Sequence, residues 1–152
     1  MKTIYTGLLT VSGALIVRRL AVPGARLGSA PLAAMLVVAA MLALGAGQIV
    51  IAPPAARLTL WLGQTWKICS PLILLLALPI YACLVVAIRR LAPTRLARTG
   101  AAAGFAAGAL AATLYGLHCP EQAAAFVASW HTLGIGAATA LGAVTGRRLL
   151  RW

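Results

Sequence analysis

The chain alternates between five apolar runs and short stretches that are polar or contain proline. The runs cover residues 3–17, 29–51, 70–88, 99–117 and 123–145. The hydrocarbon core of a bilayer needs about 20 apolar residues per spanning helix, and all the runs except the first come close to that length. Because lipid requires every backbone polar group to be paired internally, and because the runs lack the alternation of barrel strands, each run is predicted to form a helix.

Composition indicates the surroundings of these helices. Apolar residues make up 62% of the 152 residues, and charged residues only 9%. A water-soluble domain of this size cannot bury so much apolar surface, so we expect lipid to cover most of it. The sequence therefore predicts an all-α fold: a polytopic membrane helix bundle of about five transmembrane helices, forming a single domain over residues 1–152 within the lipid bilayer.

The basic residues lie mostly on one side of the predicted membrane. Three segments hold ten of the 13 Lys and Arg residues: 18–28, 89–98 and 147–151. Only Lys2, Arg57 and Lys67 lie on the other side. Under the positive-inside rule this distribution predicts a multi-pass protein whose C-terminus is cytoplasmic. Arginines placed at the ends of apolar runs, instead of along one solvated face, also argue against nucleic acid as a partner.

The N-terminus is harder to place. Five spans with a cytoplasmic C-terminus put residue 1 outside, which is unfavourable for Lys2, and the short first run has no signal-peptide cleavage pattern after it. We therefore expect the natural architecture to contain a cytoplasmic leader and another helix before residue 1, with six helices in the full-length form.

Small residues recur every fourth position in the last two runs. Six glycines carry most of this pattern: Gly100, Gly104, Gly108, Gly134, Gly142 and Gly146. Small residues at this spacing line one helix face and let two backbones approach closely. The last two helices are therefore predicted to pack as an antiparallel pair. His131 falls on the same face, so we expect it to point into the bundle, either bonded to a neighbouring polar group or serving a function.

Two cysteines lie close to the same predicted membrane surface. Cys69 comes directly before the third run, and Cys119 follows the fourth. If their helices are neighbours, the two thiols can form a disulfide. Alternatively, they join His118 and Glu121 as candidate ligands of a thiophilic metal ion. Cys83, in the middle of an apolar run, is interpreted as a small buried hydrophobe.

The segment after Cys119 is expected to begin the last helix. Pro120 suits a first helical turn, and the carboxylate of Glu121 would there meet the positive end of the helix dipole. Glu121 is also the only acid in the chain, and no nucleophile accompanies a base. We therefore expect a protein that is not an enzyme, and no cofactor is predicted.

Five features carry a resemblance to a known family. They are Arg89-Arg90-Leu91-Ala92-Pro93-Thr94-Arg95, the stretch from Gly100 through Gly108, Leu117-His118-Cys119-Pro120-Glu121, Phe126-Val127 with Trp130, and Gly146-Arg147-Arg148-Leu149-Leu150-Arg151-Trp152. The chain resembles the NrsF-type anti-sigma factors of the proteobacterial inner membrane. The resemblance implies a six-helix protein that holds an extracytoplasmic-function sigma factor inactive. It also implies that Cys69 and Cys119 are periplasmic and sense heavy-metal or oxidative stress, and that the family's leader and first helix are missing here.

These expectations combine into one mechanism. The outer thiols oxidise or bind metal, and the packing of the last helices then shifts. The cytoplasmic arginines change their contact with the sigma factor, and the expected contact residues are Arg89, Arg90, Arg95, Arg147, Arg148 and Arg151.

Two other interpretations stay open at the level of sequence. A small membrane transporter or channel subunit would use His131 and a kink at Pro79 to line a path, and it would move solute in liposomes. A structural membrane assembly protein would use its glycine faces to bind other membrane helices, and it would recover such partners without a sigma factor.

Overall fold

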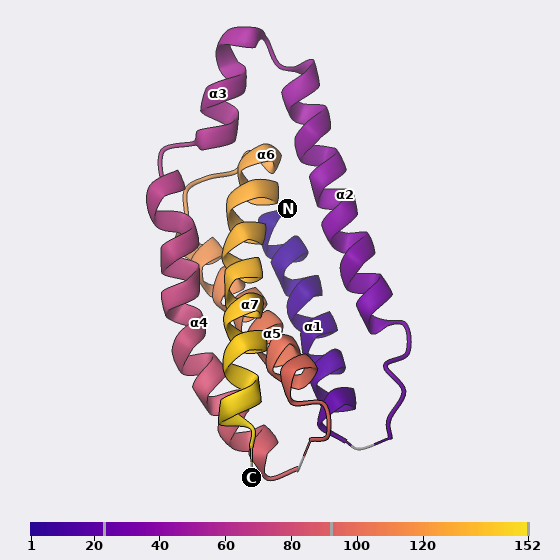
Figure 1. Cartoon of the computed structure of the whole chain (residues 1–152). Coiled ribbons are helices and arrows are strands. Elements are labelled where there is room, and N and C mark those ends of the chain that lie inside the picture. Colours follow the sequence, from indigo (N-terminus) through magenta and orange to yellow (C-terminus); the bar gives the residue numbers. More distant parts are fainter. Residues whose placement is uncertain (23, 92, 152) are drawn as a thin grey trace.

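The computed structural model describes residues 1–22, 24–91 and 93–151 as a bundle of helices (Figure 1). The elements are α1 (Lys2–Ala21), α2 (Ala30–Ile51), α3 (Pro54–Leu62), α4 (Trp66–Arg89), α5 (Leu96–His118), α6 (Ala124–Phe126), η1 (Val127–His131) and α7 (Thr132–Leu149). No strand occurs in the described residues, and the predicted all-α fold is confirmed. Ala92 and Trp152, which belong to the motifs above, lie outside these residues.

Five helical segments are long and apolar enough to cross a membrane. They are Lys2–Ala21, Ala30–Ile51, Pro54–Arg89, Leu96–His118 and Ala124–Leu149. The first is longer than its apolar run, since α1 continues through Arg18 and Arg19 to Ala21. Arginine is a good helix former, and its long side chain carries the charge away from the apolar neighbours. The fold is compatible with insertion in a membrane.

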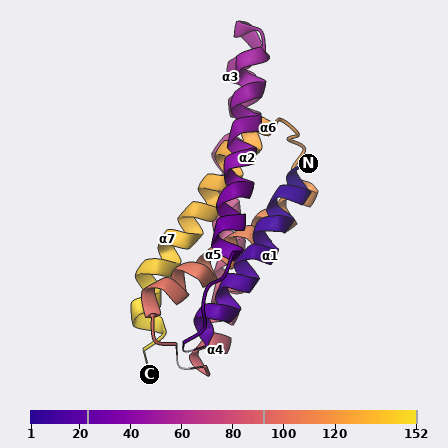
Figure 2. The same cartoon turned by 90° about the vertical axis from the view of Figure 1, so that its right-hand side faces the viewer.

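The segment between the second and third apolar runs, residues 52–69, contains a short helix of its own. α3 ends at Leu62, and α4 begins at Trp66, ahead of Cys69. Between them, Gly63 has a φ of 57°, a left-handed conformation that costs glycine little. In Figures 1 and 2, α3 extends beyond the rest of the bundle at the end where the N-terminus lies.

α5 lies at the centre of the bundle and packs against α7, α1 and α4. Most of its residues are buried, and most of the buried ones are alanine or glycine. Because such residues add little side-chain volume, neighbouring backbones come close. A Cβ added to Gly13 of α1, for example, would lie 2.9 Å from the Cα of Ala106 on α5.

The predicted glycine pattern lies largely in the contact between α5 and α7. At one end of this contact, a Cβ added to Gly100 would lie 2.6 Å from the Gly146 Cα. At the other end, a Cβ added to Gly108 would lie 3.1 Å from the Ile135 Cα. Increasing residue numbers on α5 meet decreasing numbers on α7, so the two helices are antiparallel, as the spacing predicts.

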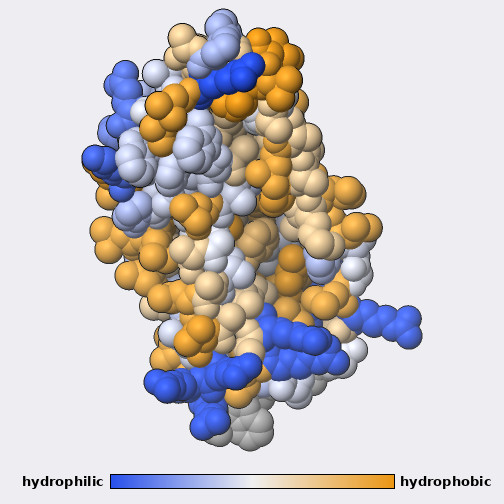
Figure 3. Space-filling model, turned by 45° about the horizontal axis from the view of Figure 1, so that its top comes forward, coloured by the Kyte–Doolittle hydropathy of each residue, from blue (hydrophilic) through white to orange (hydrophobic). Residues whose placement is uncertain are grey.

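The outward faces of α2 and α4 carry large apolar side chains. Leu36 and Val50 on α2, and Leu75 and Val86 on α4, are all more than half exposed. Figure 3 shows hydrophobic residues around the body of the molecule and strongly hydrophilic residues toward its two ends. Such an apolar surface is unfavourable in water, and it matches a bilayer as the surroundings of the protein.

Candidate functional site

Cys69 and Cys119 lie together at one end of the bundle. Cys69 is in the first turn of α4, and Cys119 directly follows α5. Both side chains are buried, at 0% and 4% exposure, and both are free thiols. The Tyr115 side chain neighbours both sulfurs, and the Thr65 hydroxyl is 4.0 Å from the Cys119 Sγ. The structure therefore brings together the two thiols that the sequence singles out. The interpretation of Cys83 as a buried side chain is wrong, because it is exposed on the surface of α4.

The imidazole beside these thiols is that of His131. Its Nδ1 lies 3.6 Å from the Cys69 Sγ, and the side chain is fully buried. The Tyr115 and Phe126 rings enclose the imidazole, with centroids 6.0 and 6.1 Å away. Within the part of the chain that the structure describes, His131 Nε2 has no hydrogen-bond partner. The sequence predicts that His131 points into the bundle, but it does not identify Cys69 as its neighbour.

A π-helical turn positions His131. Residues Val127–His131 form η1, in which the helix is wound more widely than an α-helix. Such turns are rare and often occur at functional sites. The Ser70 hydroxyl donates a 2.7 Å hydrogen bond to the Trp130 carbonyl, which fixes η1 against the first turns of α4. One turn further, a Cβ added to Gly134 would lie 3.0 Å from the Ile73 Cβ, so this part of the glycine face meets α4 and not α5.

His118 and Glu121 do not join a metal site in this arrangement. His118 is exposed at the end of α5. Glu121 Oε1 accepts a 2.6 Å hydrogen bond from the backbone N–H of Gln64, in the turn between α3 and α4. Among the residues that the structure describes, no three His, Cys, Asp or Glu side chains converge on one point.

Glu121 therefore stabilises a different feature from the one expected. The sequence predicts that Pro120 and Glu121 begin the last helix, but α6 begins at Ala124. A carboxylate is a strong acceptor, and the turn after α3 offers it a backbone donor. Gly63 has a left-handed φ of 57°, and a Cβ added there would lie 2.8 Å from this carboxylate, so both the backbone conformation and the contact favour glycine. Glu121 thus ties the Cys119 segment to the turn that leads to Cys69.

Lys2 is a buried cation at the same end of the bundle. Its side chain is 8% exposed, and its Nζ donates to the carbonyl oxygens of Cys119 and Glu121, the latter at 3.0 Å. Tyr5 on the next turn of α1 bonds to the Thr132 hydroxyl at 2.7 Å. The start of α1 is thus tied to both the Cys119 segment and α7. From the sequence, Lys2 is only one of three basic residues on the side with few positive charges. Its hydrogen-bond partners could not be predicted, because they are more than a hundred residues away in the chain.

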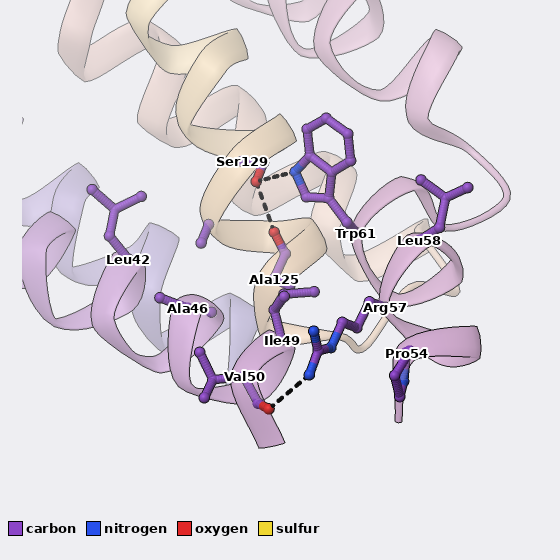
Figure 4. A pocket seen from close by; sticks show the side chains of 12 residues that line it. Leu42, Ala46, Ile49, Val50, Pro54, Arg57, Leu58, Trp61, Ala125 and Ser129 are labelled. Carbon is purple, nitrogen blue, oxygen red and sulfur yellow. Dashed lines mark hydrogen bonds between the residues drawn. The ribbon is translucent and has the colours of Figure 1, made fainter. Parts of the chain in front are cut away.

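An apolar groove lies beside this thiol site. It has a volume of about 660 Å³ and is lined by residues of α2, α3, α6 and η1. In Figure 4 the Trp61 indole N–H donates to the Ser129 hydroxyl at 3.0 Å, and Arg57 reaches the Val50 carbonyl at 3.3 Å. Trp130 also donates to the Trp61 carbonyl, so tryptophans hold α3 against η1.

The opposite end of the bundle carries the other ten basic residues, all of them arginine. Arg19 donates to the Arg26 carbonyl at 3.0 Å, and these two residues with Arg95 line a groove of about 410 Å³. Arg89 donates to the Arg151 carbonyl at 3.5 Å. The six arginines expected to contact a partner are exposed here: Arg89, Arg90, Arg95, Arg147, Arg148 and Arg151. Sequence reasoning did not single out Arg19 and Arg26.

Comparison with known proteins places this arrangement in a family. Residues 1–152 match the family described as "NrsF: Negative regulator of sigma F". The chain is 43% identical over 153 residues to the "Anti-sigma-F factor NrsF" of Caulobacter vibrioides (strain NA1000 / CB15N), and it covers 72% of that protein. It is 40% identical over 152 residues to the "Probable anti-sigma-F factor NrsF" of Azospira oryzae (strain ATCC BAA-33 / DSM 13638 / PS), and it covers 71% of that protein.

All of this chain is included in both alignments. No solved structure matches the chain. Because the family match extends over the full length, and because both relatives share well above 30% of their aligned residues with it, the chain belongs to the NrsF family of negative regulators of sigma F.

Proposed function

We propose that this protein is an anti-sigma factor of the bacterial inner membrane with a cytoplasmic C-terminus. Its arginine end holds an extracytoplasmic-function sigma factor inactive. Its thiol end lies at the periplasmic surface, where Cys69 and Cys119 respond to heavy-metal or oxidative stress. The response releases the sigma factor for transcription.

The observation that carries the proposal is the separation of the two ends. The two thiols lie at one end, and ten arginines lie at the other. Basic residues accumulate on the cytoplasmic side of membrane proteins, so the arginine end is the one that can meet a cytoplasmic partner. The thiol end is then exposed to the more oxidising compartment, in which disulfides persist.

The arginine end has the chemistry of a surface for an acidic protein segment. Glu121, the only acidic residue, lies at the other end, so no acidic side chain neutralises these arginines. Arginine binds carboxylates through two parallel hydrogen bonds. Complementary charge also speeds the encounter of two proteins and suppresses wrong partners. The groove lined by Arg19, Arg26 and Arg95 offers a concave place for such a segment.

Three helices connect the two ends directly. α4 carries both Cys69 and Arg89, and α5 lies between Arg95 and Cys119. His131 ends η1, and α7 continues from it to the arginine end at Arg147. The close contact between α5 and α7 leaves little freedom for one helix to move without the other. A change in the spacing of the thiols therefore alters the spacing of the arginine-bearing loops, provided that the signal binds one arrangement more tightly than the other.

A reporter under sigma-factor control in living cells tests this proposal. Cys69→Ser and Cys119→Ser should each leave the reporter silent when metal or oxidant is added, while Cys83→Ser should respond as the parent does. Full response in both Cys69→Ser and Cys119→Ser would contradict the proposal. A C-terminal green fluorescent protein fusion should fluoresce, and a C-terminal alkaline phosphatase fusion should be inactive, if the C-terminus is cytoplasmic.

A further inference from the structure

The inference starts from the contact between Cys69 and His131. The Cys69 Sγ and the His131 Nδ1 are 3.6 Å apart, and both side chains have no exposed surface. The other imidazole nitrogen, Nε2, is buried and has no hydrogen-bond partner in the described residues. Nδ1 is therefore the imidazole nitrogen that faces the thiol, and it is the one that can share a ligand with the Cys69 sulfur.

The distance between these two atoms suits two ligands of one metal ion. Tetrahedral zinc has a metal–sulfur distance of about 2.3 Å and a metal–nitrogen distance of 2.0–2.1 Å, which places the two donor atoms about 3.6 Å apart. The Cys69 and His131 atoms already have that separation. A weak S–H···N contact can hold the pair at this distance without an ion. Thiolate and imidazole are also the ligand types that thiophilic metals select.

Cys119 lies next to this pair. Tyr115 neighbours both the Cys69 and the Cys119 sulfurs, and Thr65 contacts Cys119 from the turn before α4. No three candidate ligands converge in the described residues, so the third ligand must move to join the pair. Cys119 is the residue directly after α5, so its sulfur can join the pair by rotation about the Cα–Cβ bond together with a movement of this segment toward α4.

We propose that Cys69, His131 and Cys119 are the ligands of one thiophilic divalent cation and that His118 is not. The proposal rests on the proposed function, in that it identifies the ligand of the sensing thiols. As the ion binds, each S–H bond breaks and a sulfur–metal bond forms. The two protons pass to solvent, the imidazole contributes a lone pair, and no electron is transferred.

This site explains how a signal changes the helices. Cys69 belongs to α4, His131 to η1 and Cys119 to the segment after α5, so one ion would connect three helices that end in arginine-bearing loops. In the structure the Cys119 carbonyl accepts a hydrogen bond from Lys2, and the Cys119 Sγ is 4.0 Å from the Thr65 hydroxyl. Binding draws the Cys119 segment toward α4 and η1.

Cadmium binding tests the ligand set. The protein carrying Cys83→Ser is placed in lipid nanodiscs, and Cd²⁺ is added while the sulfur-to-cadmium absorption band is recorded. We expect one equivalent to bind. His131→Gln should weaken binding at least tenfold, Cys69→Ser and Cys119→Ser should each reduce the band, and His118→Gln should match the parent.

A second measurement avoids substitution of the buried His131. The ¹¹³Cd chemical shift of the bound ion distinguishes a site with two sulfurs and a nitrogen from one with sulfur and oxygen ligands. A spectrum without nitrogen ligation, or unchanged cadmium affinity in folded His131→Gln, would overturn the proposal. Sigma-factor binding is measured separately by co-purification. Cadmium binding through His131 without release of the sigma factor would contradict only the proposed function, and release that does not depend on His131 would contradict only the inference.

Discussion

The two ends of the bundle are built in opposite ways. At the thiol end, the chemically active groups are buried: Cys69, Cys119, His131 and Lys2 each have less than 9% of their surface exposed. They are held by bonds between segments far apart in the chain. At the arginine end, the side chains are exposed, and the hydrogen bonds of Arg19 and Arg89 go to the backbone carbonyls of Arg26 and Arg151.

This difference separates two kinds of recognition. A buried pocket with a few fixed donor atoms suits a small ligand, because each donor has one position and water is excluded. An exposed set of long cationic side chains suits a large surface, because the side chains adjust to their partner and act through charge. The proposed function accordingly assigns a small ligand to the thiol end and a macromolecule to the arginine end, and a tightly packed helical centre joins the two.

The largest expected effect comes from breaking the centre that joins the ends. In Gly142→Leu the new side chain would overlap the Gly100 backbone on α5, which cannot move aside. Overpacking a core costs about 1–3 kcal/mol or more, and we expect at least about 3 kcal/mol here because the obstacle is backbone. Thermal unfolding in detergent, followed by circular dichroism, measures the loss. Gly136→Leu, on the exposed face of α7 where nothing lies within 4 Å, should unfold like the parent.

Charge reversal at the arginine end should have the next largest effect. Arg147→Glu combined with Arg148→Glu removes two exposed cations and introduces repulsion toward an acidic partner. We expect roughly a hundredfold loss of sigma-factor affinity, which corresponds to about 2.7 kcal/mol. Binding to the purified sigma factor at several salt concentrations measures it. Lys67→Glu changes an exposed cation at the other end, and an equal loss there would contradict the assignment of the two ends.

Loosening the thiol end should have a moderate effect. Lys2→Met keeps a long side chain but leaves the Cys119 and Glu121 carbonyls without their donor. An unsatisfied buried acceptor costs about 1–3 kcal/mol, so we expect about 2 kcal/mol of destabilisation. Cys119 should also react several-fold faster with N-ethylmaleimide, as followed by mass spectrometry. The exposed Lys67→Met is the matched control, and faster labelling in that variant too would show that the buried contacts of Lys2 are not the cause.

The smallest expected effect concerns the turn beside the thiols. Glu121→Ala removes the acceptor of the Gln64 N–H, which lies near the surface. We expect about 1 kcal/mol of destabilisation by thermal unfolding, because a net hydrogen bond contributes about that much. Gln122→Ala, at the exposed neighbouring position, should be nearly neutral. Equal stability of Glu121→Ala and the parent would exclude a structural role for this carboxylate.

Prediction from sequence succeeds where the signal is local. The apolar runs fixed the number of long helices, and the fourfold glycine spacing identified the α5–α7 contact. It failed where the partner is distant. The expected helix start at Glu121 was wrong because this carboxylate bonds to the α3–α4 turn, 57 residues earlier. His118 is a candidate ligand only through its position next to Cys119 in sequence, and the structure shows its side chain exposed at the end of α5.

The sequence by itself determined that the protein is helical, apolar and basic at one end, since helix formation and the positive-inside rule depend on composition and spacing along the chain. Only the tertiary structure decided which groups surround the thiols. His131 meets Cys69 across 62 residues, and Lys2 meets Cys119 across 117. Those contacts depend on how α1, α4 and η1 pack around α5, and on a π-helical turn that no periodicity in the sequence indicates.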